Sequence, residues 1–104
     1  MGITNLEALI TSLVGFYTRR GYNGSVVTTA NFTPLSNVSV PAQLVYVSNT
    51  TGKTLWVSTD NGVTYLALPD GAMFPFNNIA NIAAVWVKAS DATTGLTVTF
   101  RYEV

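Results

Sequence analysis

Apolar and polar residues alternate without interruption over residues 96–104. A period of two is the repeat of a β-strand, in which successive side chains point to opposite faces of a sheet. The pattern therefore predicts a strand with one face on a core and the other in water or against a partner. The side chains on its apolar face are Leu96, Val98, Phe100, Tyr102 and Val104.

The chain after residue 43 consists of short apolar runs separated by turn residues. The pairs Asn61-Gly62 and Asp70-Gly71 supply the positive φ angles that tight hairpins need. Strands that recur about every ten residues with such turns predict a sandwich or small barrel. We expect a mainly β protein whose body, residues 44–104, is an antiparallel, jelly-roll-like β-sandwich. The predicted strands cover residues 43–49, 54–59, 63–68, 72–76, 82–89 and 96–103.

The first twenty residues have the period of a helix instead. Thr4 and Glu7 form a capping box, apolar residues follow at helical spacing, and Arg19-Arg20-Gly21 is a typical helix stop. These signals predict an N-terminal α-helix over about residues 4–19, as a packing or anchoring element within residues 1–20. Its apolar stripe is wide, so we expect it to cover a sheet or to dock on another subunit. The candidate contact residues are Leu9, Leu13, Phe16, Tyr17, Arg19 and Arg20.

Residues 21–43 are rich in Thr, Ser, Asn and Gly and contain Pro34 and Pro41. The run Val26-Val27-Thr28-Thr29 could form a short strand, and the rest of the segment is predicted to be extended and irregular. It is either a loop that crosses the end of the sandwich or an arm that lies on a neighbour. The pattern does not separate these two alternatives, and the chain as a whole reads as one domain.

Three predicted strands share an apolar–aromatic–Val–polar pattern, and their central aromatics are Tyr46, Trp56 and Trp86. If the flanking Val and Leu side chains point into the core, the three aromatics point out of it. They would then form an apolar patch that needs a cover. The opposite phase, with the aromatics inward, is equally compatible with any single strand.

Composition limits the chemistry that this chain can perform. There is no Cys and no His, which removes the thiolate ligand, the thiol nucleophile and the commonest general base near neutral pH. The five carboxylates, Glu7, Asp60, Asp70, Asp91 and Glu103, fall in a predicted helix cap, three turns and a polar strand face. Nothing in the pattern pairs them in a cleft, and Asp60-Asn61-Gly62 reads as a turn rather than as part of a calcium loop. We expect no enzymatic activity, no metal and no cofactor.

Charge limits the partners as well. Only 10% of the residues are charged, compared with about 25% in ordinary soluble domains, and the formal net charge is zero. A nucleic-acid partner would require clustered Lys and Arg, so none is expected. No apolar run is long enough for a membrane helix, and the N-terminus lacks the features of a secretory signal. A surface with so few charges favours self-association or contact with neighbouring proteins.

Three segments of the predicted body resemble small β-sandwich virion proteins of tailed bacteriophages. They are the hydroxyl-rich run 45–51, the Asp-Asn-Gly hairpin over residues 57–65, and the aromatic-Val-Lys-Ala strand over residues 85–90. Proteins of this group serve as capsid decoration or cement, head fibres, and neck or tail accessory subunits. The resemblance implies a symmetric homo-oligomer, often a trimer, that is attached to other virion proteins such as the major capsid protein. It implies no catalytic residue.

The leading hypothesis is therefore a non-enzymatic virion structural protein that is assembled in the host cytoplasm. It would act through homo-oligomerisation and docking, with interface roles for the helix residues named above and for Tyr46, Trp56 and Trp86. The alternative is a carbohydrate-binding module that uses these strand aromatics as a stacking platform. That mechanism requires exposed, coplanar rings with polar residues beside them.

Overall fold

The computed structural model describes residues 21–77, 79 and 81–104, and within them the chain is almost entirely β. The helix predicted over residues 4–19 lies outside the described residues. Among the described residues the only helical element is a single 3-10 turn, η1 (Ile82–Ala84). The strands are β1 (Gly21–Val27), β2 (Thr33–Pro34), β3 (Leu44–Ser48), β4 (Leu55–Ser58), β5 (Leu66–Leu68), β6 (Met73–Asn77), β7 (Trp86–Ala89) and β8 (Thr97–Glu103).

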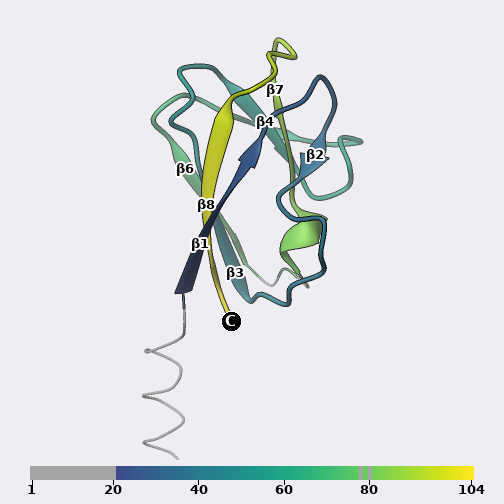
Figure 1. Ribbon diagram of the computed structural model, residues 1–104, viewed down its shortest axis with the longest axis vertical. Coiled ribbons are helices and arrows are strands. Elements are labelled where there is room, and N and C mark those ends of the chain that lie inside the picture. The colour runs from purple at the N-terminus through teal and green to yellow at the C-terminus, as the bar shows by residue number, and fades with distance from the viewer. Residues whose placement is uncertain (1–20, 78, 80) are drawn as a thin grey trace, which may run out of the picture.

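The strands form two four-stranded antiparallel sheets, one with the order β1-β8-β3-β6 and the other with the order β2-β7-β4-β5 (Figure 1). We call them the β8 sheet and the β7 sheet. The pairs β1–β8, β2–β7, β3–β6 and β4–β5 are those of one long hairpin rolled up into two layers, as in a double-stranded β-helix. The prediction of a mainly β protein with two antiparallel layers is therefore confirmed.

The core lies between the two sheets and is built mainly from alternate residues of central strands. The β8 sheet contributes Val45, Val47 and Val98 to the core, and the β7 sheet contributes Leu55 and Val87. All five side chains are fully buried. Full burial of one such side chain stabilises the fold by about 1.5–3 kcal/mol. The alternation in the sequence therefore reports which side chains face the core.

Strand β1 lies within the segment for which the sequence indicated an arm or loop. Its residues are paired with β8 along their whole length, so this part of the segment is a strand of the β8 sheet. Local propensity cannot reveal this strand, because Gly and Asn are poor strand formers. Gly24 lies opposite Phe100, whose ring occupies the space that a side chain at residue 24 would need. Glycine is therefore required at residue 24 by the contact with the Phe100 ring and not by the local backbone conformation.

Two predicted strands are shorter than the sequence suggested. Over residues 82–89 the first part forms η1, whose Ile82 amide donates to the Val40 carbonyl, and only Trp86–Ala89 joins the sheet. Over residues 63–68 only Leu66–Leu68 is paired, because Asp60 holds the preceding residues in a loop. Apolar runs predicted both strands, but their limits are set by hydrogen bonds to the Val40 carbonyl in the first case and to the Asp60 side chain in the second.

Candidate functional site

The burial of the neighbouring residues shows whether the three strand aromatics point toward the core or away from it. The residues on either side of Tyr46, Trp56 and Trp86 are buried, so all three rings point away from the core and are half-buried. They do not form one patch, however. Tyr46 lies on β3 in the β8 sheet, whereas the two tryptophans lie on β4 and β7 in the β7 sheet. The expectation of a single three-aromatic patch is therefore wrong, because period-two patterning separates inside from outside without saying which sheet a strand joins.

The outer face of the β7 sheet carries an aromatic cluster. The Trp56 and Tyr65 rings stack with centroids 4.4 Å apart, and the Tyr65 ring lies 6.0 Å from that of Phe32. The Lys88 ammonium lies over the Trp56 ring, 5.1 Å from its centroid. These contacts use the faces of the indole within the molecule itself. Trp56 is therefore a poor platform for a sugar ring.

Tyr65 is brought to this cluster by the loop over residues 59–65. Asn61 and Gly62 have φ angles of 57° and 86°, which match a type I′ turn, and the ring of Phe32 packs against Gly62. Asp60 accepts hydrogen bonds from the Ser58 hydroxyl at 2.6 Å and from the Thr64 amide and hydroxyl at 2.9 Å and 2.6 Å. These bonds, the one from Ser58 first, lower the pKa of Asp60 to about 2. The structure therefore shows Asp60 as a turn residue.

The outer face of the β8 sheet carries a shallow hollow of about 600 Å³. We call it the β8-sheet hollow. Its lining includes one charged residue, Arg101, and two aromatic residues, Tyr46 on the outer face and Phe100, whose side chain belongs to the core, together with Met73 and amide and hydroxyl groups. It is lined by Asn23, Gly24, Tyr46, Ser48, Met73, Thr99, Phe100 and Arg101.

The third surface is an opening of the core between the edge strands β5 and β6. Leu66 is paired with Val57, and Phe74 with Val47, so both side chains are on the core side of their sheets. Their partners are buried, yet Leu66 is 48% exposed and Phe74 is 38% exposed. Phe76 packs against Phe74, with ring centroids 4.9 Å apart, and also borders a small hollow beside Leu66. We call Leu66, Phe74 and Phe76 the open flank.

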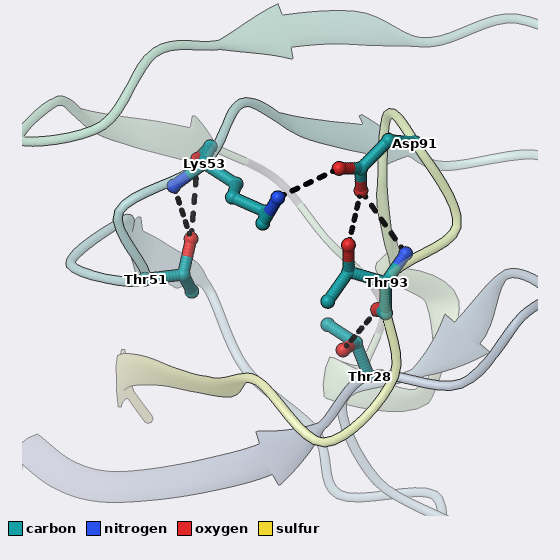
Figure 2. Close-up of polar contacts among 5 residues, drawn as sticks. All are labelled: Thr28, Thr51, Lys53, Asp91 and Thr93. Atoms are coloured by element: carbon teal, nitrogen blue, oxygen red, sulfur yellow. Dashed lines mark hydrogen bonds and ion pairs between the residues drawn. The ribbon is translucent and has the colours of Figure 1, made fainter.

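The loops at one end of the sandwich are joined by polar contacts (Figure 2). The Lys53 ammonium pairs with Asp91 at 2.9 Å, and Asp91 also accepts hydrogen bonds from the Thr93 amide and hydroxyl. The Thr28 hydroxyl donates to the Thr93 carbonyl at 2.9 Å. The bonds from Thr93, followed by that from Lys53, hold the pKa of Asp91 well below its usual range. These contacts hold the loops at this end together, because the side chains bond to one another and to the loop backbone.

The described carboxylates are all engaged locally. Besides Asp60 and Asp91, Asp70 accepts a hydrogen bond from the Gly52 amide, and Glu103 lies 3.9 Å from Arg101. Among the described residues no group of three potential metal-ligating side chains exists. A search of the same part of the chain finds no helix with the length and apolarity needed to cross a membrane.

Of the predicted interface residues, Tyr46, Trp56 and Trp86 are placed as above. The other six, Leu9, Leu13, Phe16, Tyr17, Arg19 and Arg20, lie outside the described residues. Sequence reasoning missed the open flank, Phe32, Tyr65 and Arg101. Phe74 and Leu66 carried a usable signal, because both belong to predicted strands. Nothing in their pattern showed that these strands would be edges.

Comparisons with known proteins complete this description. No family model matches the chain, and no curated protein matches it. Among solved structures, the solution NMR structure of a de novo designed double-stranded β-helix is similar at 17% identity, with a TM-score of 0.42. The match covers 81% of this chain and 96% of that chain.

Proposed function

We propose that this chain is a non-enzymatic structural subunit of a bacteriophage virion, of the capsid decoration, cement or head and neck accessory type. It acts by homo-oligomerisation and by docking on other virion proteins. The finer fold description, a jelly-roll-like sandwich with an N-terminal helix as packing element, is part of the same proposal. The open flank is the observation that carries it, since core-side apolar residues left in water favour a covering partner.

The chemistry of the flank favours contact through side chains. Burial of a Leu or Phe side chain contributes about 1.5–3 kcal/mol when complete, and roughly half of this remains available at Leu66 and Phe74. Continuous strand addition is disfavoured, because β5 has three residues and Pro75 removes a donor from the β6 edge. The partner therefore contributes apolar side chains more than backbone hydrogen bonds.

Ion pairs contribute little to such an assembly. The described residues form two ion pairs, Lys53–Asp91 and Arg101–Glu103, and three of the four side chains are about half exposed, so each pair adds little stability. A chain with 10% charged residues and zero net charge offers weak repulsion between copies. These two facts support a second copy of the chain as the cover. The sequence resemblance over residues 45–90 supports the virion as its location.

The test of self-assembly is the mass of the full chain in solution. Sedimentation equilibrium is expected to give a defined oligomer, and Leu66→Lys combined with Phe74→Ser is expected to give a monomer. The control is Val38→Lys, which adds the same charge at a 66% exposed valine away from the flank. A monomeric wild-type chain, or an oligomer that survives the double change, contradicts the proposal.

The test of location is mass spectrometry of purified particles of the phage that encodes this chain. Its peptides are expected in particles that have been freed of host protein, at a copy number set by the symmetry of the particle. Their absence from intact particles rules out the virion, whatever the oligomeric state of the isolated protein.

Carbohydrate binding by Trp56 and Trp86 is a weaker candidate. A stacking platform needs exposed ring faces, whereas Tyr65 and Lys88 already contact Trp56. Tyr46, the third ring of that hypothesis, lies on the opposite sheet.

A further inference from the structure

We propose that the β8-sheet hollow binds a saccharide with a carboxylate group, such as a sialic acid or a uronic acid. Its volume, about 600 Å³, is within the range of small-molecule sites. The proposal is independent of the assembly proposed above, because the hollow is on the outer face of the β8 sheet and the open flank is on the core side of β5 and β6.

The hollow is built on a regular grid of outward-facing side chains. Asn23, Arg101 and Tyr46 form one row across β1, β8 and β3, because Asn23 pairs with Arg101 and Arg101 pairs with Tyr46. Thr99 and Ser48 are paired in the next row. Neighbouring strands lie about 4.8 Å apart, so groups in one row fall at a spacing that hydroxyl groups of a sugar can reach. Arg101, Thr99, Tyr46 and Ser48 lie on the two central strands, β8 and β3, whereas Asn23 lies on the edge strand β1.

The polar side chains of the hollow differ from those of the loops in their hydrogen bonding. Hydroxyls at the loop end, such as those of Thr28, Thr51 and Thr93, are bonded to other parts of the protein. Within the described part of the chain, the side chains of Asn23, Ser48 and Thr99 have no hydrogen-bond partner. Donors and acceptors that are positioned but unused are available to a ligand.

Arg101 determines the charge of that ligand. It is the single charged residue that lines the hollow, and its side chain is 47% exposed. Glu103 approaches its Nε at 3.9 Å, too far for a hydrogen bond, so the guanidinium retains donors for another acceptor. The guanidinium lies over Gly21, on the side of Arg101 away from Thr99 and Ser48, so it must turn along the sheet toward the hollow to meet a ligand there. A guanidinium binds a carboxylate through paired hydrogen bonds, which favours an acidic sugar over a neutral one.

Tyr46 supplies the apolar contact that a sugar ring needs. Its ring is half-buried beside Arg101 on the outer face, and, unlike Trp56, it has no aromatic partner among the described residues. Met73 borders the same hollow from β6 and is 59% exposed. The accessible lining of the hollow is mainly apolar, so its ligand needs an apolar ring face as well as the carboxylate and hydroxyls that Arg101 and the polar side chains would contact.

The test is a titration of the full chain with sialyllactose and, as its neutral counterpart, lactose, monitored by two-dimensional NMR. Sialyllactose is expected to shift the amide signals of Asn23, Ser48 and Thr99 and to leave the indole signals of Trp56 and Trp86 in place. Arg101→Gln is expected to weaken binding about tenfold or more, the effect of losing a charge-assisted bond. Lys88→Gln removes a cation from the opposite face and is the matched control.

Each result decides the proposal. Selective shifts with sialyllactose that are reduced by Arg101→Gln, but not by Lys88→Gln, support it, and a parallel titration with trigalacturonate shows whether uronic acids also bind. Thr99→Val, a change of similar volume on the same surface, is expected to weaken binding without altering the fold. Equal binding of lactose, shifts centred on the tryptophans, or no shifts with either acidic saccharide overturn it. The variant Leu66→Lys with Phe74→Ser is expected to bind as the wild type does, so failure of the assembly proposal remains distinguishable.

Discussion

Asn49 shows how a single residue joins the turns at one end of the sandwich. It is fully buried, and its side-chain amide donates to the carbonyls of Lys53 and Leu68 at 2.7 Å and 2.8 Å. Its carbonyl oxygen accepts from the Thr51 amide at 3.1 Å and from the Thr51 hydroxyl at 2.7 Å. All four hydrogen-bonding positions of the side chain are therefore used, which explains how a polar group is accommodated there without charge or water.

Asn49→Ala should destabilise the protein strongly. The change leaves the buried Leu68 carbonyl without the Asn49 donor, whereas the Lys53 carbonyl can still accept from the Thr51 hydroxyl at 3.1 Å, so a loss of about 1–3 kcal/mol is expected. Chemical denaturation with urea measures it. Asn37→Ala, at an exposed position, is the control and is expected to change stability by less than about 0.5 kcal/mol. Equal effects of the two changes would show that the Asn49 network is energetically unimportant.

At the scale of single residues, the sequence predicts local backbone conformation better than it predicts tertiary contacts. The run Thr50-Thr51-Gly52 indicated a turn, and Gly52 indeed has a φ of 84°. That Asn49 would be buried and would span from this turn to Leu68 depends on the β5–β6 hairpin, nineteen residues away in the sequence. Likewise the phase of Trp56 could be weighed from its buried neighbours, but its stacking on Tyr65 depends on a loop contact that no local pattern encodes.

At the scale of elements, strands and turns were predicted wherever a local signal existed. The alternating segment 96–104 became β8, and the glycines of the predicted turns, Gly52, Gly62, Gly71 and Gly95, all have positive φ. A short strand was indicated only at residues 26–29, and the earlier part of β1 was not predicted, because pairing with β8 stabilises residues that have low strand propensity. The division of strands between two sheets was also out of reach, since it is a property of pairing and not of period.

The turns held by aspartate should make the stability of this protein depend on pH. In the folded state the pKa of Asp60 is about 2, and that of Asp91 is also lowered, against about 3.9 in an unfolded chain. A lowered folded-state pKa stabilises the fold above the unfolded value, and this contribution is lost as the pH falls through that value toward the folded one. The melting temperature should therefore decline between about pH 4 and pH 2 as these carboxylates take up protons.

Variants separate this effect from general acid denaturation. Asp60→Asn keeps an acceptor for the Thr64 amide but has no charge to titrate, and Asp91→Asn does the same at the other loop. Melting curves of the double variant between pH 6 and pH 2 are expected to fall less steeply than those of the wild type. Parallel curves would mean that other groups control acid stability.

At the scale of the whole molecule, the distribution of apolar surface matters more than its amount. The two layers close over the valine-rich centre of the core, while the edge formed by β5 and β6 leaves Leu66 and Phe74 partly in water. The sequence is rich in hydroxyl and amide side chains, and only 10% of its residues are charged. The sequence suggested this tendency through its composition, but the position of the opening emerges only from the order of strands in each sheet.

If a second copy covers the open flank, folding and association are coupled, and the melting temperature must depend on concentration. For a dimer, each tenfold dilution removes about 0.7 kcal/mol per chain, which for a domain of this size lowers the melting temperature by about 3–6 °C. Calorimetry over a wide concentration range measures the slope. The Leu66→Lys, Phe74→Ser variant is expected to melt at one temperature at all concentrations, whereas Val38→Lys is expected to keep the wild-type slope. A wild-type melting temperature that is independent of dilution would place the apolar flank outside any self-association and would leave its cover to a different protein.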